Sequence, residues 1–144
     1  MRSRDEISYR LALAEGFLRE AEQDFELERW RSCVDNAQLS VENAGKAVLA
    51  IFGVPPKTHE PAQALVALLE TGRVPDSLAT ELRSCLPDFL SLGSAEHFLT
   101  DYGDESTYTL PWELFTAESA SEALEAARRC VKSARRVLVA FDSS

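Results

Sequence analysis

The stretch AQLSVENAGKAVLAIFG, residues 37–53, decides the fold because its apolar residues recur at helical spacing up to a glycine. The same spacing reaches back to Trp30, in steps of three and four that put the apolar residues on one helical face. Gly53 can take the left-handed conformation, and Pro55 and Pro56 cannot continue the hydrogen-bond ladder. We therefore expect a helix from about residue 30 to residue 53.

Helical spacing also governs most of the remaining chain, and strand-like alternation is nearly absent. It predicts helices over about 5–29, 61–70, 75–90 and 116–141. Little separates the first helix from the helix over 30–53, so these two should form an antiparallel hairpin. The predicted fold is all-α, an up-and-down bundle of four long helices plus a short helix, in one domain spanning residues 1–144.

The sequence marks the last helix clearly and the stretch before it poorly. Thr116 is a good N-cap for the last helix, whose acids near the start and bases near the end complement the helix dipole. Residues 91–115 lack the period, and we expect only a helical turn there, near 95–100. Segments of this kind inside a compact domain are often functional. Leu39 and Leu49 face away from the Trp30 stripe, so they pack on another helix or form a subunit interface.

Charge and cysteine content narrow the classes of function. The net charge of −9 argues against a chain that coats nucleic acid with its whole surface. The three cysteines are far apart and form no CxxC pair, so we predict no metal site, no cofactor, and reduced thiols of a cytoplasmic protein. The polar start MRSRDEISYR does not resemble a signal peptide, and no apolar run approaches the ~20 residues of a membrane helix.

Three polar residues interrupt the apolar stretch 37–53 at intervals of four: Gln38, Glu42 and Lys46. One interpretation is a solvated flank of the bundle, with Glu42 and Lys46 as an exposed i,i+4 pair worth about 0.2–0.5 kcal/mol. The other is a polar cleft. There Lys46 would meet a phosphate as a point charge, Gln38 would read a base edge or sugar, and Glu42 would hold Lys46 in place.

Two further residues and one charged run have both structural and functional interpretations. His59, after a proline turn, either caps the next helix or contacts a ligand at the end of the preceding one. Tyr102 either packs on the bundle with its hydroxyl in water or closes over Lys46 and stacks on a base. The basic run at 128–136 fits a solvated face at a helix C-terminus better than an RNA-binding groove.

These segments, in this order, resemble the HEPN (higher eukaryotes and prokaryotes nucleotide-binding) domain over about residues 5–141. The most specific element is an AQ-x3-E-x3-KA pattern, formed here by residues 37, 38, 42, 46 and 47 and followed by Gly53 and His59. The DYGDE segment around Tyr102 is similar to the tyrosine-containing element that precedes the last helix in that family.

The resemblance implies an all-α bundle, usually a homodimer, and many small members act with a minimal nucleotidyltransferase. Some members are metal-independent RNases that carry an arginine, a polar residue and then a histidine. Here the positions where the arginine would precede His59 are Phe52, Gly53 and Val54, and those before His97 are residues 90–92, Leu-Ser-Leu. None is arginine, so the catalytic pair cannot be carried over onto this chain.

We therefore predict a non-catalytic HEPN-type module that binds a nucleotide, a minimal nucleotidyltransferase or both, in a toxin–antitoxin-like pair. Its expected ligand-binding residues are Gln38, Glu42, Lys46, His59 and Tyr102. The alternatives are an RNase with a degenerate active site and a purely structural dimer adaptor. A positioned acid–base pair supplies much of the rate of an RNase, and the sequence offers no candidate pair.

Overall fold

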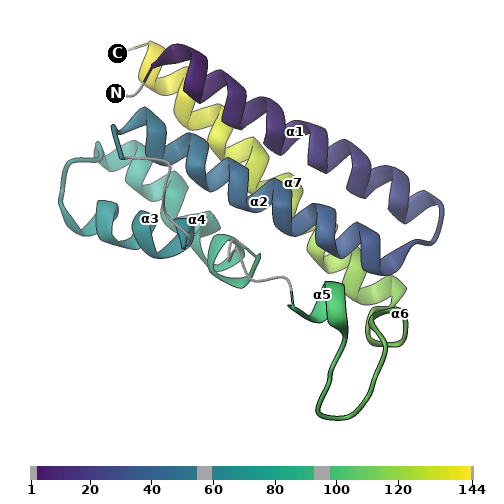
Figure 1. Cartoon of the computed structure of the whole chain (residues 1–144). Helices are drawn as coiled ribbons and strands as arrows, with labels where there is room; N and C mark the ends of the chain where they lie inside the picture. The colour runs from purple at the N-terminus through teal and green to yellow at the C-terminus, as the bar shows by residue number, and fades with distance from the viewer. Residues whose placement is uncertain (1–2, 55–59, 93–97, 144) are drawn as a thin grey trace.

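The computed structural model describes residues 3–54, 60–92 and 98–143, and every described element is a helix apart from one isolated bridge (Figure 1). The helices, in chain order, are α1 Arg4–Glu26, α2 Trp30–Ile51, α3 Pro61–Glu70, α4 Asp76–Leu92, α5 Phe98–Tyr102, α6 Pro111–Leu114 and α7 Ala117–Asp142. Four are long and α3 is short, so the predicted all-α bundle is confirmed.

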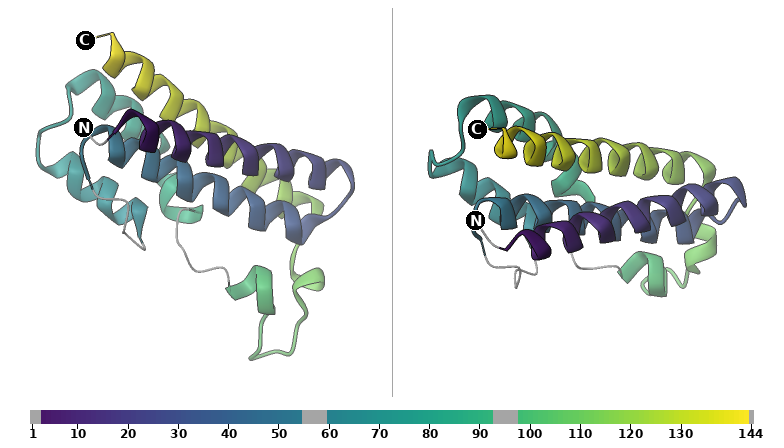
Figure 2. Two further views of the ribbon diagram at one scale, coloured as in Figure 1. Left: turned by 45° about the horizontal axis from the view of Figure 1, so that its top comes forward. Right: turned by 90° about the horizontal axis from the view of Figure 1, so that it is seen from above.

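The long helices α1, α2 and α7 run side by side for most of their length (Figures 1 and 2). α1 and α2 form the expected antiparallel hairpin, and both ends of the chain lie at its open end. Arg4 there donates to Asp142 over 2.9 Å. α3 and α4 cover the half of the bundle nearest the termini, whereas α5 and α6 lie near the α1–α2 turn.

The core is built from the stripes that the sequence marks. Ile7, Ala14 and Ala21 of α1 are fully buried, and so are Ala37, Val41, Ala44 and Val48 of α2. Alanines at these positions let the helix axes approach closely. Leu49 is also fully buried within the chain, so its apolar surface packs on other helices of the bundle and is not left for a subunit interface.

The helix ends follow local chemistry. Thr116 caps α7 through a reciprocal pair of bonds with Ser119, as its N-cap position predicts. α2 ends at Ile51, and Gly53 then takes a φ of 81°. α1 ends at Glu26, before the expected residue 29, because Glu28 turns to a φ of 57° and the chain reverses there.

Two boundaries differ from expectation. α4 continues to Leu92 through Pro87, which deprives the Arg83 carbonyl of its usual donor; both residues are exposed, so water can supply the bond. The irregular stretch 91–115 holds two short helices, α5 and α6, and a bridge between Asp104 and Thr109. The helical turn expected near 95–100 overlaps α5 at residues 98–100, and residues 95–97 lie outside the described residues.

The three cysteines are buried and unpaired, as the sequence predicts. Burial raises the pKa of Cys33 to about 11, with the nearby Asp24 carboxylate adding to the effect. Burial also raises the pKa of Cys130, again with a carboxylate, that of Asp88, contributing. Among the helices described, none is both long enough and apolar enough to cross a membrane.

Candidate functional site

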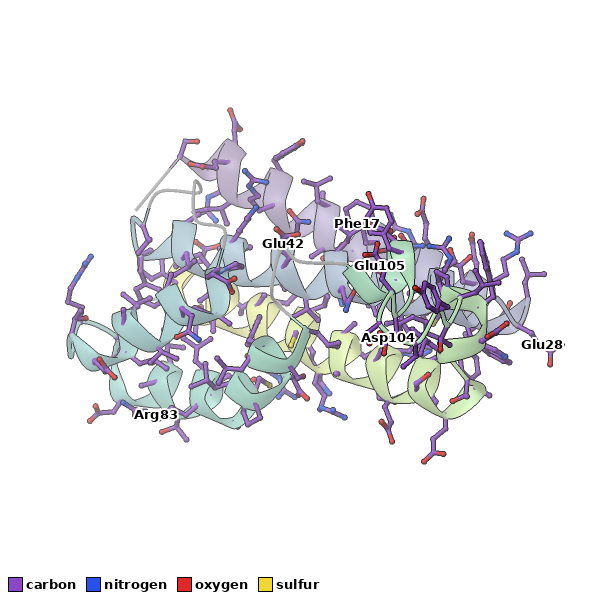
Figure 3. The ribbon with its side chains drawn as sticks, turned by 60° about the horizontal axis from the view of Figure 1, so that its bottom comes forward. Phe17, Glu28, Glu42, Arg83, Asp104 and Glu105 are labelled. Atoms are coloured by element: carbon purple, nitrogen blue, oxygen red, sulfur yellow. The ribbon has the colours of Figure 1, made fainter. Side chains whose placement is uncertain are left out.

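The polar row of α2 is largely enclosed, although a charged row usually marks a solvated face. The Glu42 and Lys46 side chains are only 12% and 16% exposed, and Nζ of Lys46 lies 3.4 Å from Oε1 of Glu42. Figure 3 views this face of α2 and labels Glu42. An ammonium group removed from water needs a partner, and Glu42 supplies it. The two residues therefore form an enclosed ion pair rather than an exposed one.

The row extends toward the start of α2 through two charged residues that the sequence analysis missed. Arg31 Nη1 donates to the carbonyl of Thr100 over 3.0 Å, and Thr100 Oγ1 donates to Asp35 Oδ1 over 3.1 Å. Thr100 is 1% exposed, so these bonds seal α5 onto α2. The spacing of 31, 35, 38, 42 and 46, in steps of three and four, is the signal that could have found them.

Gln38 opens onto a groove of about 410 Å³ between α2, the end of α4 and the first half of α7. Arg129 and Asp88 form its charged wall through two hydrogen bonds of 2.8 and 3.0 Å. Its other polar residues are Ser91, Ser119 and Glu122, and its floor is apolar. Such a groove offers hydrogen-bond donors and acceptors beside apolar side chains, a combination typical of small-molecule sites.

A second hollow, of about 500 Å³, lies at the opposite end of the row beside the α1–α2 turn. Trp30, Trp112, Arg29 and Arg31 line much of it. The Arg31 guanidinium is already bonded to Thr100, and Trp30 packs edge-on against Phe25 at 5.2 Å between ring centroids. We place the candidate site along the predicted row, where Gln38 lines the groove and the enclosed pair of Glu42 and Lys46 follows about one and two turns further along α2.

Tyr102 lies at the end of α5 and is 64% exposed. α5 is fixed at Asp35, and Lys46 lies eleven residues (46 − 35) further along α2, about 16 Å at a rise of 1.5 Å per residue. The structure therefore places Tyr102 at the Arg31–Asp35 end of the row and not beside Lys46. His59 lies outside the described residues.

The basic run of α7 has partners on neighbouring helices. Arg128 pairs with Glu22 and Arg135 with Glu15 on α1, while Arg129 pairs with Asp88 and Arg136 with Glu81 on α4. The four arginine side chains remain 43–57% exposed, so this is the solvated basic face that the sequence favours. These pairs tie α7 to both sides of the bundle and neutralise much of its charge.

One of the acids near Tyr102, Asp104, serves the local turn. Asp104 accepts hydrogen bonds from the backbone and the hydroxyl of Ser106, and the hydroxyl bond is the main reason that the pKa of Asp104 is lowered. Within residues 3–54, 60–92 and 98–143, no three histidine, cysteine or acidic side chains gather in a way that could hold a metal ion.

The helix order, the hairpin carrying the polar row and the long capped final helix define a class of helical bundle. The family model of the HEPN domain matches residues 7–139, nearly the whole chain. This chain belongs to the HEPN domain family. No curated protein matches it significantly.

Proposed function

We propose that this chain is a non-catalytic HEPN module that binds a nucleotide through the polar row of α2. Lys46 would meet a phosphate, Gln38 would contact the base or sugar in the groove, and Glu42 would hold Lys46 in place. The module would act as a homodimer in a toxin–antitoxin-like pair with a minimal nucleotidyltransferase. His59 and Tyr102 would add contacts at the ends of the row.

The enclosed Glu42–Lys46 pair is the observation that carries the proposal. A lysine ammonium has three donors, and the described residues place one acceptor, Glu42 Oε1, within ion-pair distance. The Lys46 side chain is 16% exposed, so it has lost much of its hydration but can still be reached by a ligand. A phosphate oxygen would satisfy the remaining donors, so the pair is better suited to ligand binding than to stability alone.

The missing arginine ahead of each histidine supports ligand binding over RNA cleavage. Residues 52–54 and 90–92 hold no arginine ahead of either histidine, so the family's RNase pair has no counterpart. A purely structural adaptor, in contrast, would not need a cation enclosed on the same row as a groove-lining glutamine. These two alternatives differ from the proposal in outcomes that can be measured.

Isothermal titration calorimetry with adenosine and guanosine mono-, di- and triphosphates tests the proposal. We expect at least one of them to bind the wild type, and Lys46→Met to weaken that binding by about tenfold or more. Lys132→Met is the matched control, because Lys132 is an exposed lysine on α7. Equal affinity of wild type and Lys46→Met refutes the role of Lys46, and absence of binding favours the adaptor. Cleavage of RNA by the purified chain favours the RNase alternative.

The partner part of the proposal has its own test. Affinity capture from the native host, followed by mass spectrometry, should recover a small nucleotidyltransferase with the tagged chain. Analytical ultracentrifugation of the purified chain should give the mass of a dimer. Recovery of the bait alone, or a monomeric mass, contradicts the corresponding part.

A further inference from the structure

Arg10 of α1 lies beside the polar row and is the least satisfied cation of that face. Its Nη1 is 3.5 Å from Oδ1 of Asn43, at the limit of a hydrogen bond. Its Nε is buried and has no hydrogen-bond acceptor among the described residues. The guanidinium carbon lies 5.7 Å from the ring centroid of Tyr9, which is 60% exposed, so the end of the side chain remains near the surface.

Several other arginines of the described residues have closer hydrogen-bond or ion-pair partners than Arg10 has. Arg31 and Arg73 donate to backbone carbonyls at 3.0 Å, and the arginines of α7 pair with carboxylates. Arg10 is half-buried, yet no carboxylate of the described residues lies within the 4.0 Å of an ion pair, not even Glu6 one turn earlier. A partly desolvated guanidinium with an unbonded Nε is costly for the folded chain.

Arg10 of α1 and Lys46 of α2 are related through Asn43, which Arg10 contacts. Asn43 is three residues before Lys46 on α2, and residues at that spacing have Cβ atoms about 5–6 Å apart. The two cations therefore flank one short segment of the α1–α2 surface. Glu42 is the one described carboxylate within ion-pair distance of either of them.

We propose that Arg10 and Lys46 together bind one phosphate-type oxyanion on the α1–α2 surface. The two Nη groups at the end of the Arg10 side chain would donate to two oxygens, and Lys46 would act on the third as a point charge. Tyr9 would support the guanidinium plane. The inference rests on the proposed function, and it adds the second cation and the group that the site recognises.

Inorganic pyrophosphate is the probe that tests the inference without a base or sugar. Calorimetry of the full chain at low salt should show binding, and Arg10→Gln and Lys46→Met should each weaken it by about tenfold or more. Arg19→Gln is the matched control, because it removes an exposed arginine from the same helix. It should leave the affinity within about twofold, which excludes a general effect of net charge.

A measurement on the wild-type chain tests the inference without any variant, and so does not depend on whether a variant folds. In a ¹⁵N spectrum of the wild type, the guanidinium signals of Arg10 should move on addition of pyrophosphate, because its Nη groups gain acceptors. An unmoved Arg10 signal, or wild-type affinity in Arg10→Gln, overturns the inference. If nucleotides still require Lys46 in that case, the proposed function stands without Arg10. If nucleotides bind and pyrophosphate does not, the oxyanion is not the recognised group and the inference is likewise overturned.

Discussion

The energy of the Glu42–Lys46 pair follows from its enclosure and distinguishes the two interpretations of the row. At 3.4 Å and an effective dielectric constant of about 20, the attraction between the charges is about 5 kcal/mol. Loss of hydration offsets much of this. We expect a net coupling of about 1–3 kcal/mol, whereas an exposed i,i+4 pair contributes only about 0.2–0.5 kcal/mol.

A double-mutant cycle measures this coupling. Glu42→Gln, Lys46→Met and the double variant are compared with the wild type in urea unfolding, followed by the fluorescence of Trp30 and Trp112. Each single variant leaves one enclosed charge without its partner. The losses of stability of the two single variants should therefore add up to more than the loss in the double variant. The double variant should be the better folded of the charge-altered proteins.

An exposed pair on α7 serves as the control for this cycle. Glu125 and Arg128 are three residues apart, with side chains 53% and 43% exposed, so their coupling should not exceed about 0.5 kcal/mol. A coupling for Glu42 and Lys46 no larger than that of the control would mean that water reaches the pair freely. The pair would then not be enclosed, and the candidate site would lose its main support.

Two further predictions concern buried groups outside the row. Asp24, 8% exposed, accepts hydrogen bonds of 2.8 Å from Ser32 and Asn36, so Asp24→Ala should lower the free energy of unfolding by about 1.5–3 kcal/mol in urea titrations. Glu70→Ala, at an exposed acid, should change it by less than about 0.5 kcal/mol. Burial raises the pKa of Cys33 from 9.0 to about 11, so the folded state keeps a proton that the unfolded state loses, and stability should fall as pH rises from 9.0 toward that value. Cys33→Ala should flatten this decline in unfolding curves measured at several pH values, and an unchanged slope contradicts it.

The sequence was a sound guide to the helices because their signals are local. The apolar spacing around Ala37 and Val41 fixes which face of α2 is buried, and Thr116 and Gly53 mark helix ends through bonds and backbone angles of their own neighbourhood. The errors in boundary have equally local causes, such as the positive φ of Glu28. The stretch 91–115 could not be predicted well, because α5 is held by Thr100 bonds to α2 and not by its own period.

The candidate site was predictable only in part. Gln38, Glu42 and Lys46 are four residues apart, and this spacing alone predicts that they lie in one row on a helix. Their enclosure is a different matter, since it depends on what packs around α2. Arg10 lies 33 residues from Asn43 along the chain, and no spacing rule relates the two.

By itself, then, the sequence determined the all-α class, the order of the long helices and the row of polar residues on α2, since each depends on residues a few positions apart. Tertiary structure alone decided that Glu42 and Lys46 are enclosed, that Arg10 contacts Asn43 of α2, and that Arg135 meets Glu15 from 120 residues away. The physical reason is that burial and ion pairing depend on how helices rotate and dock against one another. That arrangement minimises the free energy of the whole bundle and is not encoded in any one helix.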